Sequence, residues 1–287
     1  MSWALVLTAP PAELELLAAW LFERGALGVE LQEPGQPLMP GTPALPPDAG
    51  RCIAHFAERD EAFRSAAELG RAEAPVELAD EDWSVAWRKQ HRPLRVGPRS
   101  WVQPPWEDAP ARPGEVRVVI DPGMAFGTGS HPTTALCLER VDELLAERPG
   151  ADVLDVGTGS GIIALLAVQL GAGRVTATEN DPVALETARG GAELNAIPDG
   201  RITWALAEPD ALPGPPFEIV VANILLNTLV DLAPQLARKV SHGGRLVLSG
   251  LLASQAPAVE KGYEAQGLVA LARKERDGWI RVELSRG

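Results

Sequence analysis

Apolar and polar positions follow two different patterns along this chain. In residues 1–79, strand-like apolar runs are interleaved with stretches in which apolar residues recur every three or four positions, as on one face of a helix. The expected elements of this part are strands at residues 3–7, 27–31 and 51–57 and helices at residues 11–23 and 60–69. This pattern predicts a small α+β module.

From about residue 115 onward, short apolar runs alternate with longer helical patterns. The expected strands are residues 116–120, 153–156, 175–178, 202–205, 219–222 and 245–248. Regular alternation of this kind predicts a parallel sheet that is covered by helices on both faces.

Two segments interrupt these patterns. Residues 34–50 are dense in proline and glycine, which excludes a helix or a central strand and predicts an exposed loop. Their prolines do not recur every three residues, so a proline-rich ligand is the less favoured interpretation. Residues 82–99 carry Trp83, Trp87 and a local basic cluster, and we expect residues 80–114 to connect the two parts of the chain.

The composition is that of an ordinary globular protein, with 46% hydrophobic and 23% charged residues. Apolar runs stay shorter than the roughly 18 residues of a membrane helix, and no basic region precedes an apolar one at the start. We therefore expect a cytoplasmic protein without membrane contact. Cys52 and Cys137 are far apart and lack neighbouring metal-type ligands, so neither a disulfide nor a metal site is expected.

The formal net charge of −13 argues against tight, non-specific binding to nucleic acid, which depends on a cationic field. We therefore expect no direct nucleic-acid binding. A basic protein partner fits this charge, and solubility alone explains it equally well.

The strongest local motif lies between the expected strand 153–156 and the apolar stretch 162–170. Gly157, Gly159 and Gly161 follow the pattern G-x-G-x-G, with Asp155 two positions before the first glycine. A strand that turns through glycines into a helix exposes backbone N–H groups to an anionic or nucleotide-like ligand. The dinucleotide fingerprint has the different spacing G-x-G-x-x-G. The alternative is a glycine turn that binds nothing.

Two polar residues follow later strands at the same expected edge of the sheet. Glu179 comes directly after a strand, where a carboxylate can accept the hydroxyl hydrogens of a ribose. Asn223 ends another strand, and its side-chain oxygen can accept a hydrogen bond from an amine and orient the nitrogen lone pair. The alternative role for Asn223 is the cap of a helix that begins near Asn227.

The segment 121–134 combines three glycines and two prolines with small hydroxyl residues and Phe126, as a loop over a ligand requires. It enters a helix at about Pro132. His131 could act as a general base, but a histidine before a helical proline is more often a capping group, and we favour that role.

Together these motifs resemble the PrmA family, the bacterial methyltransferases of ribosomal protein L11. The similarity extends from about residue 81 to residue 282. It rests on the segment 121–134, the motif 155–161, Ala222-Asn223-Ile224-Leu225, the segment 248–252, and Asp82-Trp83 with Trp87-Arg88. The segment 121–134 is the most specific of these to the family.

The resemblance implies an α/β fold, with a Rossmann-like class I methyltransferase domain at residues 115–287 and a small N-terminal α+β (ferredoxin-like) domain at residues 1–79. The N-terminal domain would recognise the substrate, and residues 80–114 would link the two. The activity implied is transfer of methyl groups from S-adenosylmethionine to lysine side-chain and N-terminal amines of ribosomal protein L11, by a monomer.

The resemblance also assigns the site. Asn223 would be the catalytic residue, and no metal is implied. The cofactor-binding residues would be Thr134, Asp155, Gly157, Gly159, Glu179 and Asn223. The family more often has aspartate where this chain has Glu179, which keeps the carboxylate but lengthens its reach by one methylene.

The main alternative is a class I methyltransferase that acts on another protein or on RNA. Methyltransferases of RNA or of protein glutamine share the glycine motif, but they usually have Asn-Pro-Pro-Tyr where this chain has Asn223-Ile224-Leu225-Leu226. A nicotinamide-dependent oxidoreductase would need the other glycine spacing. A non-catalytic ribosome-binding module is disfavoured by the intact motifs.

Overall fold

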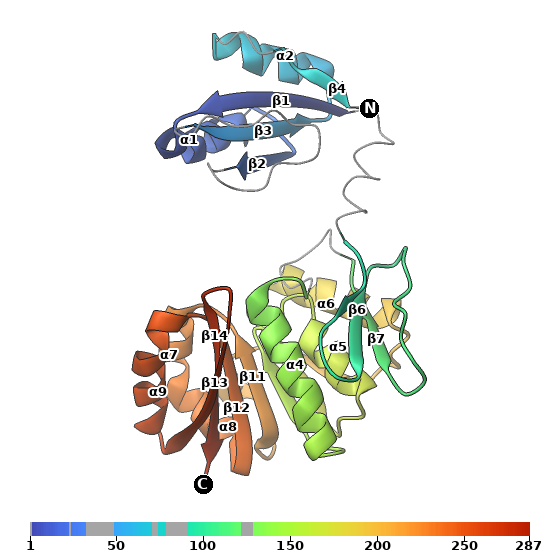
Figure 1. Cartoon of the computed structure of the whole chain (residues 1–287), viewed down its shortest axis with the longest axis vertical. Helices are drawn as coiled ribbons and strands as arrows, with labels where there is room; N and C mark the ends of the chain where they lie inside the picture. Colours follow the sequence, from blue (N-terminus) through green and yellow to red (C-terminus); the bar gives the residue numbers. More distant parts are fainter. Residues whose placement is uncertain (1, 23, 33–48, 71–73, 79–90, 122–128) are drawn as a thin grey trace. The chain divides into compact units, whose positions relative to one another are not determined.

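The computed structural model of the protein describes all residues except 1, 23, 33–48, 71–73, 79–90 and 122–128 (Figure 1). The chain divides into two compact units, Met1–Gln90 and His91–Gly287. Of the segment 80–114, which we expected to connect the two parts, residues 91–114 belong to the second unit. Trp83, Trp87 and most of the proline-rich segment lie outside the described residues.

The described residues of the first unit form a four-stranded antiparallel sheet with two helices. Its elements are β1 (Ser2–Ala9), α1 (Pro11–Phe22), β2 (Gly28–Gln32), β3 (Gly50–Phe56), α2 (Arg59–Glu68) and β4 (Val76–Leu78). The strand order β2-β3-β1-β4 is the ferredoxin-like arrangement that the resemblance implied. Alternate strand residues such as Leu5, Leu7 and Phe56 are buried in one core with Leu14 and Leu21 of α1. The hydrophobic pattern did not reveal β4, which has only three residues.

The second unit is built on a seven-stranded sheet of order β10-β9-β8-β11-β12-β14-β13. The strands are β8 (Val153–Val156), β9 (Val175–Glu179), β10 (Ile202–Leu206), β11 (Phe217–Asn223), β12 (Val240–Leu252), β13 (Leu268–Arg276) and β14 (Trp279–Arg286). The helices are α4 (Pro132–Glu147), α5 (Ile162–Gln169), α6 (Pro182–Leu194), α7 (Leu226–Asp231), α8 (Ala233–Lys239) and α9 (Ala256–Glu264). The five strands from β10 to β12 in this order all pair in parallel with their neighbours. Strand β14 is antiparallel to both β12 and β13.

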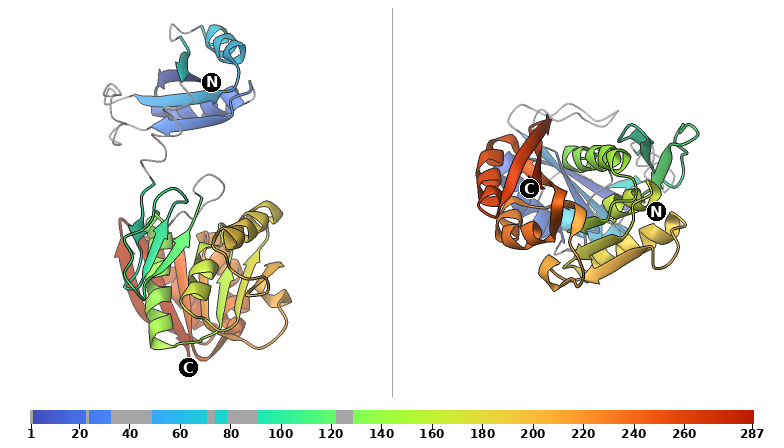
Figure 2. Two further views of the ribbon diagram at one scale, coloured as in Figure 1. Left: turned by 90° about the vertical axis from the view of Figure 1, so that its right-hand side faces the viewer. Right: turned by 90° about the horizontal axis from the view of Figure 1, so that it is seen from below.

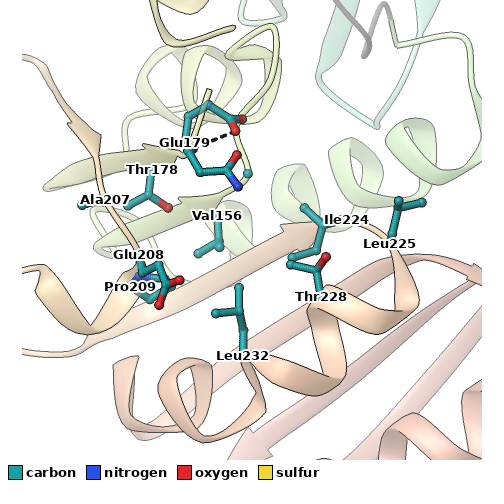
Figure 3. A pocket seen from close by; sticks show the side chains of 12 residues that line it. Val156, Thr178, Glu179, Ala207, Glu208, Pro209, Ile224, Leu225, Thr228 and Leu232 are labelled. Carbon is teal, nitrogen blue, oxygen red and sulfur yellow. Dashed lines mark hydrogen bonds between the residues drawn. The ribbon is translucent and has the colours of Figure 1, made fainter. Parts of the chain in front are cut away.

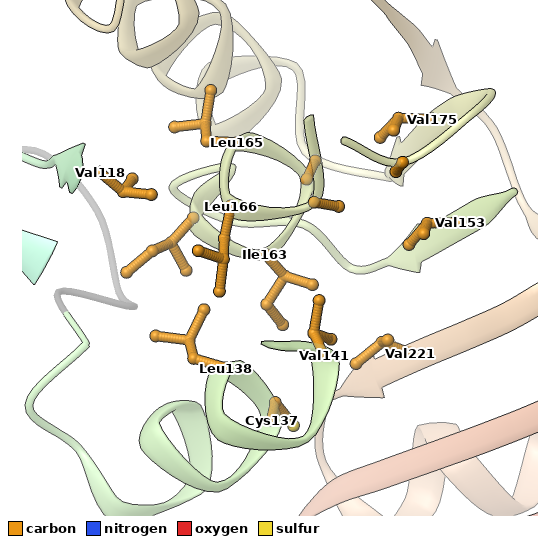
Figure 4. Packing of buried hydrophobic residues seen from close by; sticks show 14 of the residues in the cluster. Val118, Cys137, Leu138, Val141, Val153, Ile163, Leu165, Leu166, Val175 and Val221 are labelled. Atoms are coloured by element: carbon orange, nitrogen blue, oxygen red, sulfur yellow. The ribbon is translucent and has the colours of Figure 1, made fainter. Parts of the chain in front are cut away.

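Helices cover both faces of this sheet (Figures 1 and 2). Val153 and Val221 belong to one buried cluster with Leu138 of α4 and Leu166 of α5 on one face, part of which is drawn in Figure 4. Leu154, Val220 and Leu246, with Leu236 of α8 and Tyr263 of α9, are among the residues buried on the other face. Because both faces are buried, the strands are continuous apolar runs, which explains why the sequence pattern revealed them.

The order of strands reverses between β8 and β11. From β8 the chain moves outward through β9 to β10, and it then returns to the other side of β8 with β11. In open parallel sheets, ligands bind at such a switch point, outside the carboxyl ends of the strands. The fold therefore directs the search for a site to the ends of β8, β9 and β11.

One expected strand belongs to a different sheet. We expected residues 116–120 in the main sheet, but β7 (Val116–Val119) instead pairs in parallel with β6 (Ser100–Gln103), which pairs with β5 (Leu94–Arg95). Val118 still packs on the α5 side of the core. The apolar pattern therefore predicted the strand correctly, but it did not predict the strand with which it pairs.

A buried carboxylate fastens this small sheet to α4. Asp142 accepts hydrogen bonds from the backbone N–H of Arg99 at 2.8 Å and from the hydroxyl of Ser100 at 2.7 Å. Its other oxygen accepts from the Arg99 guanidinium at 2.9 Å.

Within the described part of the chain, no helix combines the length and the apolar character that crossing a membrane requires.

Candidate active site

The glycine motif forms a tight turn between β8 and α5. Gly157, Gly159 and Gly161 all have positive φ angles, of 68°, 54° and 81°, which favour glycine over any residue with a Cβ atom. The backbone N–H groups of Gly157 and Thr158 donate to the carbonyl of Thr178 at 2.9 and 3.0 Å. The turn is therefore fixed to the end of β9 as well as to β8.

Asp155 lies beneath this turn and is completely buried. One of its oxygens accepts hydrogen bonds from the Thr158 hydroxyl at 2.5 Å and from the Ala164 backbone N–H at 3.3 Å. The other oxygen, Oδ1, has no hydrogen-bond partner in the structure described. Asp155 thus ties β8 to the turn and to the first residues of α5.

Burial raises the pKa of Asp155 to about 7, because desolvation penalises the charged carboxylate. Hydrogen bonds from Thr158 and Ala164 lower this pKa, and the negative charge of Glu179 raises it further. Asp155 is expected to bind the cofactor, and the hydrogen bonds that the structure shows for it support the glycine turn.

Glu179 is the last residue of β9, and backbone N–H groups hold both of its carboxylate oxygens. Oε2 accepts from Gly159 at 3.0 Å, and Oε1 accepts from Asn180 at 2.9 Å and from Asp181 at 3.4 Å. Its carboxylate therefore closes the glycine turn from the β9 side. Asp181 caps α6 through its bond from the Val183 N–H at 2.8 Å, in accord with the structural role predicted for it.

A cavity of about 300 Å³ opens at the carboxyl ends of β8, β9 and β11 (Figure 3). This volume is at the lower end of the range for ligand sites, roughly 300–1,000 Å³. Its lining residues are Val156, Gly157, Thr178, Glu179, Asn180, Ala207, Glu208, Pro209, Ile224, Leu225, Thr228 and Leu232. Glu179 and Glu208 thus bring two carboxylates to a cavity whose other lining residues are mostly apolar or small.

Asn223 is the last residue of β11 and borders this cavity through its neighbour Ile224. Its side-chain Nδ2 donates to the hydroxyl of Thr134, in the first turn of α4, at 3.2 Å. Thr134 is buried, so this bond fixes the amide and leaves Oδ1 to accept a hydrogen bond from a bound group. The alternative capping role is wrong, because the N-cap of α7 is Leu225.

His131 caps α4, as we favoured. Its ring nitrogen Nδ1 accepts a hydrogen bond from the backbone N–H of Thr133 at 3.4 Å. The ring also packs edge-on against Trp279, with the ring centroids 5.0 Å apart. Most of the expected loop over the ligand, including Phe126 and Thr128, lies outside the described residues.

Two residues that the sequence analysis did not assign contact candidate residues that it did assign. Thr158 supplies the hydroxyl that holds Asp155, and its position inside the glycine motif was the available signal. Trp279 of β14 lies opposite Leu252 at the end of β12 and contacts the ring of His131, and no local motif surrounds it. Among the described residues, no three histidines, cysteines or acidic residues gather as metal ligands would.

Comparison with known proteins identifies the family of the chain. A family model described as ribosomal protein L11 methyltransferase (PrmA) matches residues 2–287. The chain is 42% identical to the ribosomal protein L11 methyltransferase of Myxococcus xanthus over 99% of this chain and 98% of that protein. It is 48% identical to the protein of that name from Azotobacter vinelandii, over 72% of this chain and 68% of the relative.

A solved structure is also similar. It is a ribosomal protein L11 methylase from Lactobacillus delbrueckii subsp. bulgaricus, with 32% identity and a TM-score of 0.62. The similarity covers 68% of this chain and 99% of the solved one.

The buried Asp155 predicts an unusual dependence of stability on pH. Its folded pKa of about 7 lies above its ordinary value of 3.8, so the folded state holds a proton that the unfolded state has lost. The contribution of this group is therefore most favourable below about pH 4 and is lost as the pH rises through 7. Asp155→Asn, which keeps an acceptor without the charge, should gain melting temperature relative to the unaltered protein between pH 5 and pH 8.

Thermal unfolding at several pH values measures this difference. Asp210→Asn, which removes an exposed carboxylate paired with Arg238, is the matched control. The raised pKa of Asp155 would be contradicted if the difference in melting temperature between Asp155→Asn and the unaltered protein stayed constant from pH 5 to pH 8.

Proposed function

The chain belongs to the PrmA family of ribosomal protein L11 methyltransferases, and on this premise we propose that it methylates amino groups of ribosomal protein L11, on lysine side chains and at the N-terminus. It is a class I methyltransferase that uses S-adenosylmethionine. The observation that carries the proposal is the fixed Asn223 amide beside the cavity at the switch point of the sheet. We place this activity in the cytoplasm, where it would meet the ribosomal protein.

The residues around the cavity fit S-adenosylmethionine. The Glu179 carboxylate is held in place by backbone N–H groups and can accept hydrogen bonds from ribose hydroxyls. Gly157 lets a ligand approach the backbone, and the apolar side chains of Ile224 and Leu232 offer a surface for a purine ring. Thr134, Gly159 and Asn223 would complete the contacts, with Asp155 acting from beneath the turn.

The bound cofactor supplies an activated methyl group on a sulfonium, so the protein contributes chiefly by positioning the acceptor. The acceptor amine must be neutral to attack, whereas a lysine has a solution pKa near 10.4. Asn223 Oδ1 can accept an N–H of the amine and turn its lone pair toward the methyl group. Thr134 keeps the amide in that orientation.

The first unit is proposed to recognise the protein substrate. It has a core of its own, separate from the two clusters of the second unit, and none of the cavity-lining residues belongs to it. The net charge of −13 suits a basic protein partner.

Residues 91–287 alone should therefore bind S-adenosylmethionine as tightly as the full chain but methylate intact ribosomal protein L11 far more slowly. Calorimetry and a methyl-transfer assay on the same preparation measure the two properties. Full activity of the shortened chain on the intact substrate would show that the first unit does not perform recognition.

Glu179→Gln should weaken cofactor binding about tenfold or more, since hydrogen bonds to a charged group contribute roughly 1.5–3 kcal/mol. Glu208→Gln is the matched control, because Glu208 also lines the cavity but accepts a bond from Gln235 at 2.8 Å. We expect it to change affinity little.

A cofactor analogue without ribose hydroxyls separates ribose binding from support of the turn. It should bind the unaltered protein and Glu179→Gln equally well. If the variant weakens both ligands by the same factor, Glu179 acts only through the glycine turn.

Asn223→Ala should lower the rate at saturating cofactor by roughly a hundredfold, as expected for losing one preorganised hydrogen bond in the transition state. The assay is the intact mass of purified ribosomal protein L11 after incubation with enzyme and S-adenosylmethionine. Asn227→Ala, on the exposed side of α7, is the matched control. Thr134→Val, which frees the Asn223 amide, should give a smaller loss.

Binding and single-turnover rate are measured separately on Asn223→Ala. If cofactor affinity falls tenfold or more while the rate at saturation stays normal, Asn223 is a cofactor ligand and not the group that orients the amine. If no enzyme form adds mass to ribosomal protein L11, the proposed substrate is wrong.

A further inference from the structure

A charged side chain is buried between α4 and the sheet. Arg281 lies on β14 and is only 5% exposed. Its Nε and Nη1 atoms are buried and have no hydrogen-bond partner among the described residues. Helix α4 packs over β12 and β14 in this part of the second unit (Figure 1). Because a buried guanidinium without hydrogen bonds costs stability, Arg281 is a candidate for a functional role.

The charge of Arg281 is not balanced by an ion pair of its own. The nearest carboxylate on the same face of β14 belongs to Glu283, which is also buried. Glu283 pairs with Arg140 of α4 at 2.8 Å and with Arg245 of β12 at 3.4 Å. One buried carboxylate therefore serves two other guanidinium groups. Burial lowers the pKa of Arg281, but an arginine stays charged near neutral pH.

The register of the sheet places Arg281 level with Asn223. Asn223 of β11 lies opposite Ser249 of β12. On the other side of β12, residues 280–282 of β14 lie opposite residues 248–251, so Arg281 is level with Ser249. Two strand spacings, or roughly 10 Å, therefore separate the backbone of Arg281 from that of Asn223.

Both side chains lie on the face of the sheet that α4 covers. Ile280 and Val282 are buried in the cluster on the opposite face, so Arg281 between them points toward α4. Asn223 points the same way, because its amide donates to the hydroxyl of Thr134 in the first turn of α4. The guanidinium charge and the proposed acceptor site thus share one buried layer beneath the start of α4.

Cys137 lies in this layer, one helical turn after Thr134. Burial raises the pKa of its thiol to about 12, while a hydrogen bond with Ser249 and the positive charge of Arg281 oppose that rise. The charge of Arg281 is therefore felt at a group that is bonded to the strand neighbour of Asn223.

We propose that the buried positive charge of Arg281 disfavours the ammonium form of the acceptor at Asn223 and so favours the neutral amine that attacks. This inference rests on the proposed function, because it concerns the amine acceptor. The ammonium passes its proton to water before the nitrogen forms the C–N bond, and Arg281 shifts only this equilibrium. One charge at roughly 10 Å, with an effective dielectric constant of about 20, lowers the pKa of an amine by about one unit.

Other charges on the surrounding elements either oppose this effect or are paired. Asp155 of β8 and Glu179 of β9 favour the ammonium form, and they are present in every variant compared below. His131 caps the start of α4. The remaining charged groups pair with one another: Arg140, Glu143, Glu147 and Glu139 of α4, Arg245 of β12, Lys274 and Arg276 of β13, and Glu283 of β14.

The first test measures the pH dependence of methyl transfer. Single-turnover rates on ribosomal protein L11, at saturating substrate and cofactor, report the protonation of the bound amine. In Arg281→Met the acid limb of the profile should move up by about one pH unit, which lowers the rate roughly tenfold at low pH. The rates should converge at high pH, where the amine is neutral in both proteins.

Two further variants separate charge from structure. Arg281→Lys keeps the charge and should restore the profile of the unaltered protein. Arg286→Met is the matched control, because it removes a charge at the far end of β14, where Arg286 donates to backbone carbonyls. A loss of rate in Arg281→Met that is equal at every pH would show a structural role and overturn the proposal, and so would an unchanged profile. If Arg281→Met does not fold, Arg281→Gln removes the same charge.

The second test needs no substrate. Asn223→Lys places an amine at the proposed acceptor position, and its NMR signal can be assigned by difference because the chain has four other lysines. Adding Arg281→Met should raise the pKa of the introduced lysine by about one unit, and adding Arg286→Met should leave it unchanged. An introduced lysine that titrates identically with and without Arg281→Met overturns the proposal.

The two tests also separate this inference from the proposed function. Failure of the unaltered protein to methylate ribosomal protein L11 refutes the proposed function, and the titration of the introduced lysine still decides whether Arg281 acts at Asn223.

Discussion

The site depends on how closely the end of β11 approaches its two neighbours. A Cβ atom on Gly157 would come within 2.4 Å of a methyl carbon of Ile224, and one on Gly250 within 2.2 Å of the Ile224 carbonyl oxygen. Only glycine fits at either position, and Gly250 also has a positive φ of 86°. This approach sets Ile224 into the cavity wall and turns Asn223 toward Thr134, so one steric constraint positions both halves of the site.

Two carboxylates then stiffen the turn that faces the cavity. Glu179 accepts three backbone N–H groups, and Asp155 accepts a hydroxyl and one N–H in a fully buried position. Burial of Asp155 costs stability at neutral pH, as its raised pKa shows, and the negative charge of Glu179 adds to that cost. The protein therefore gives up some stability to hold the glycine turn in one geometry.

The sequence allowed prediction of those features that depend on local pattern. Strands buried on both faces, the glycine turn and polar residues at strand ends all follow from neighbours in the chain, which is why Glu179 and Asn223 could be placed at one sheet edge. Long-range pairing could not be predicted. Nothing near residues 116–120 indicates that β7 pairs with β6 in a separate sheet, and nothing near Trp279 indicates that its strand returns to the active-site edge.

The surroundings of Asn223 suit an acceptor that must lose charge and then regain it. Ile224 and Leu225, which follow Asn223 in the chain, give the cavity wall an apolar surface, beside which an ammonium ion is less stable than in water, and this favours the neutral amine that can attack. The ammonium formed by the transfer is likewise less stable at this surface than in water, which favours release of the product.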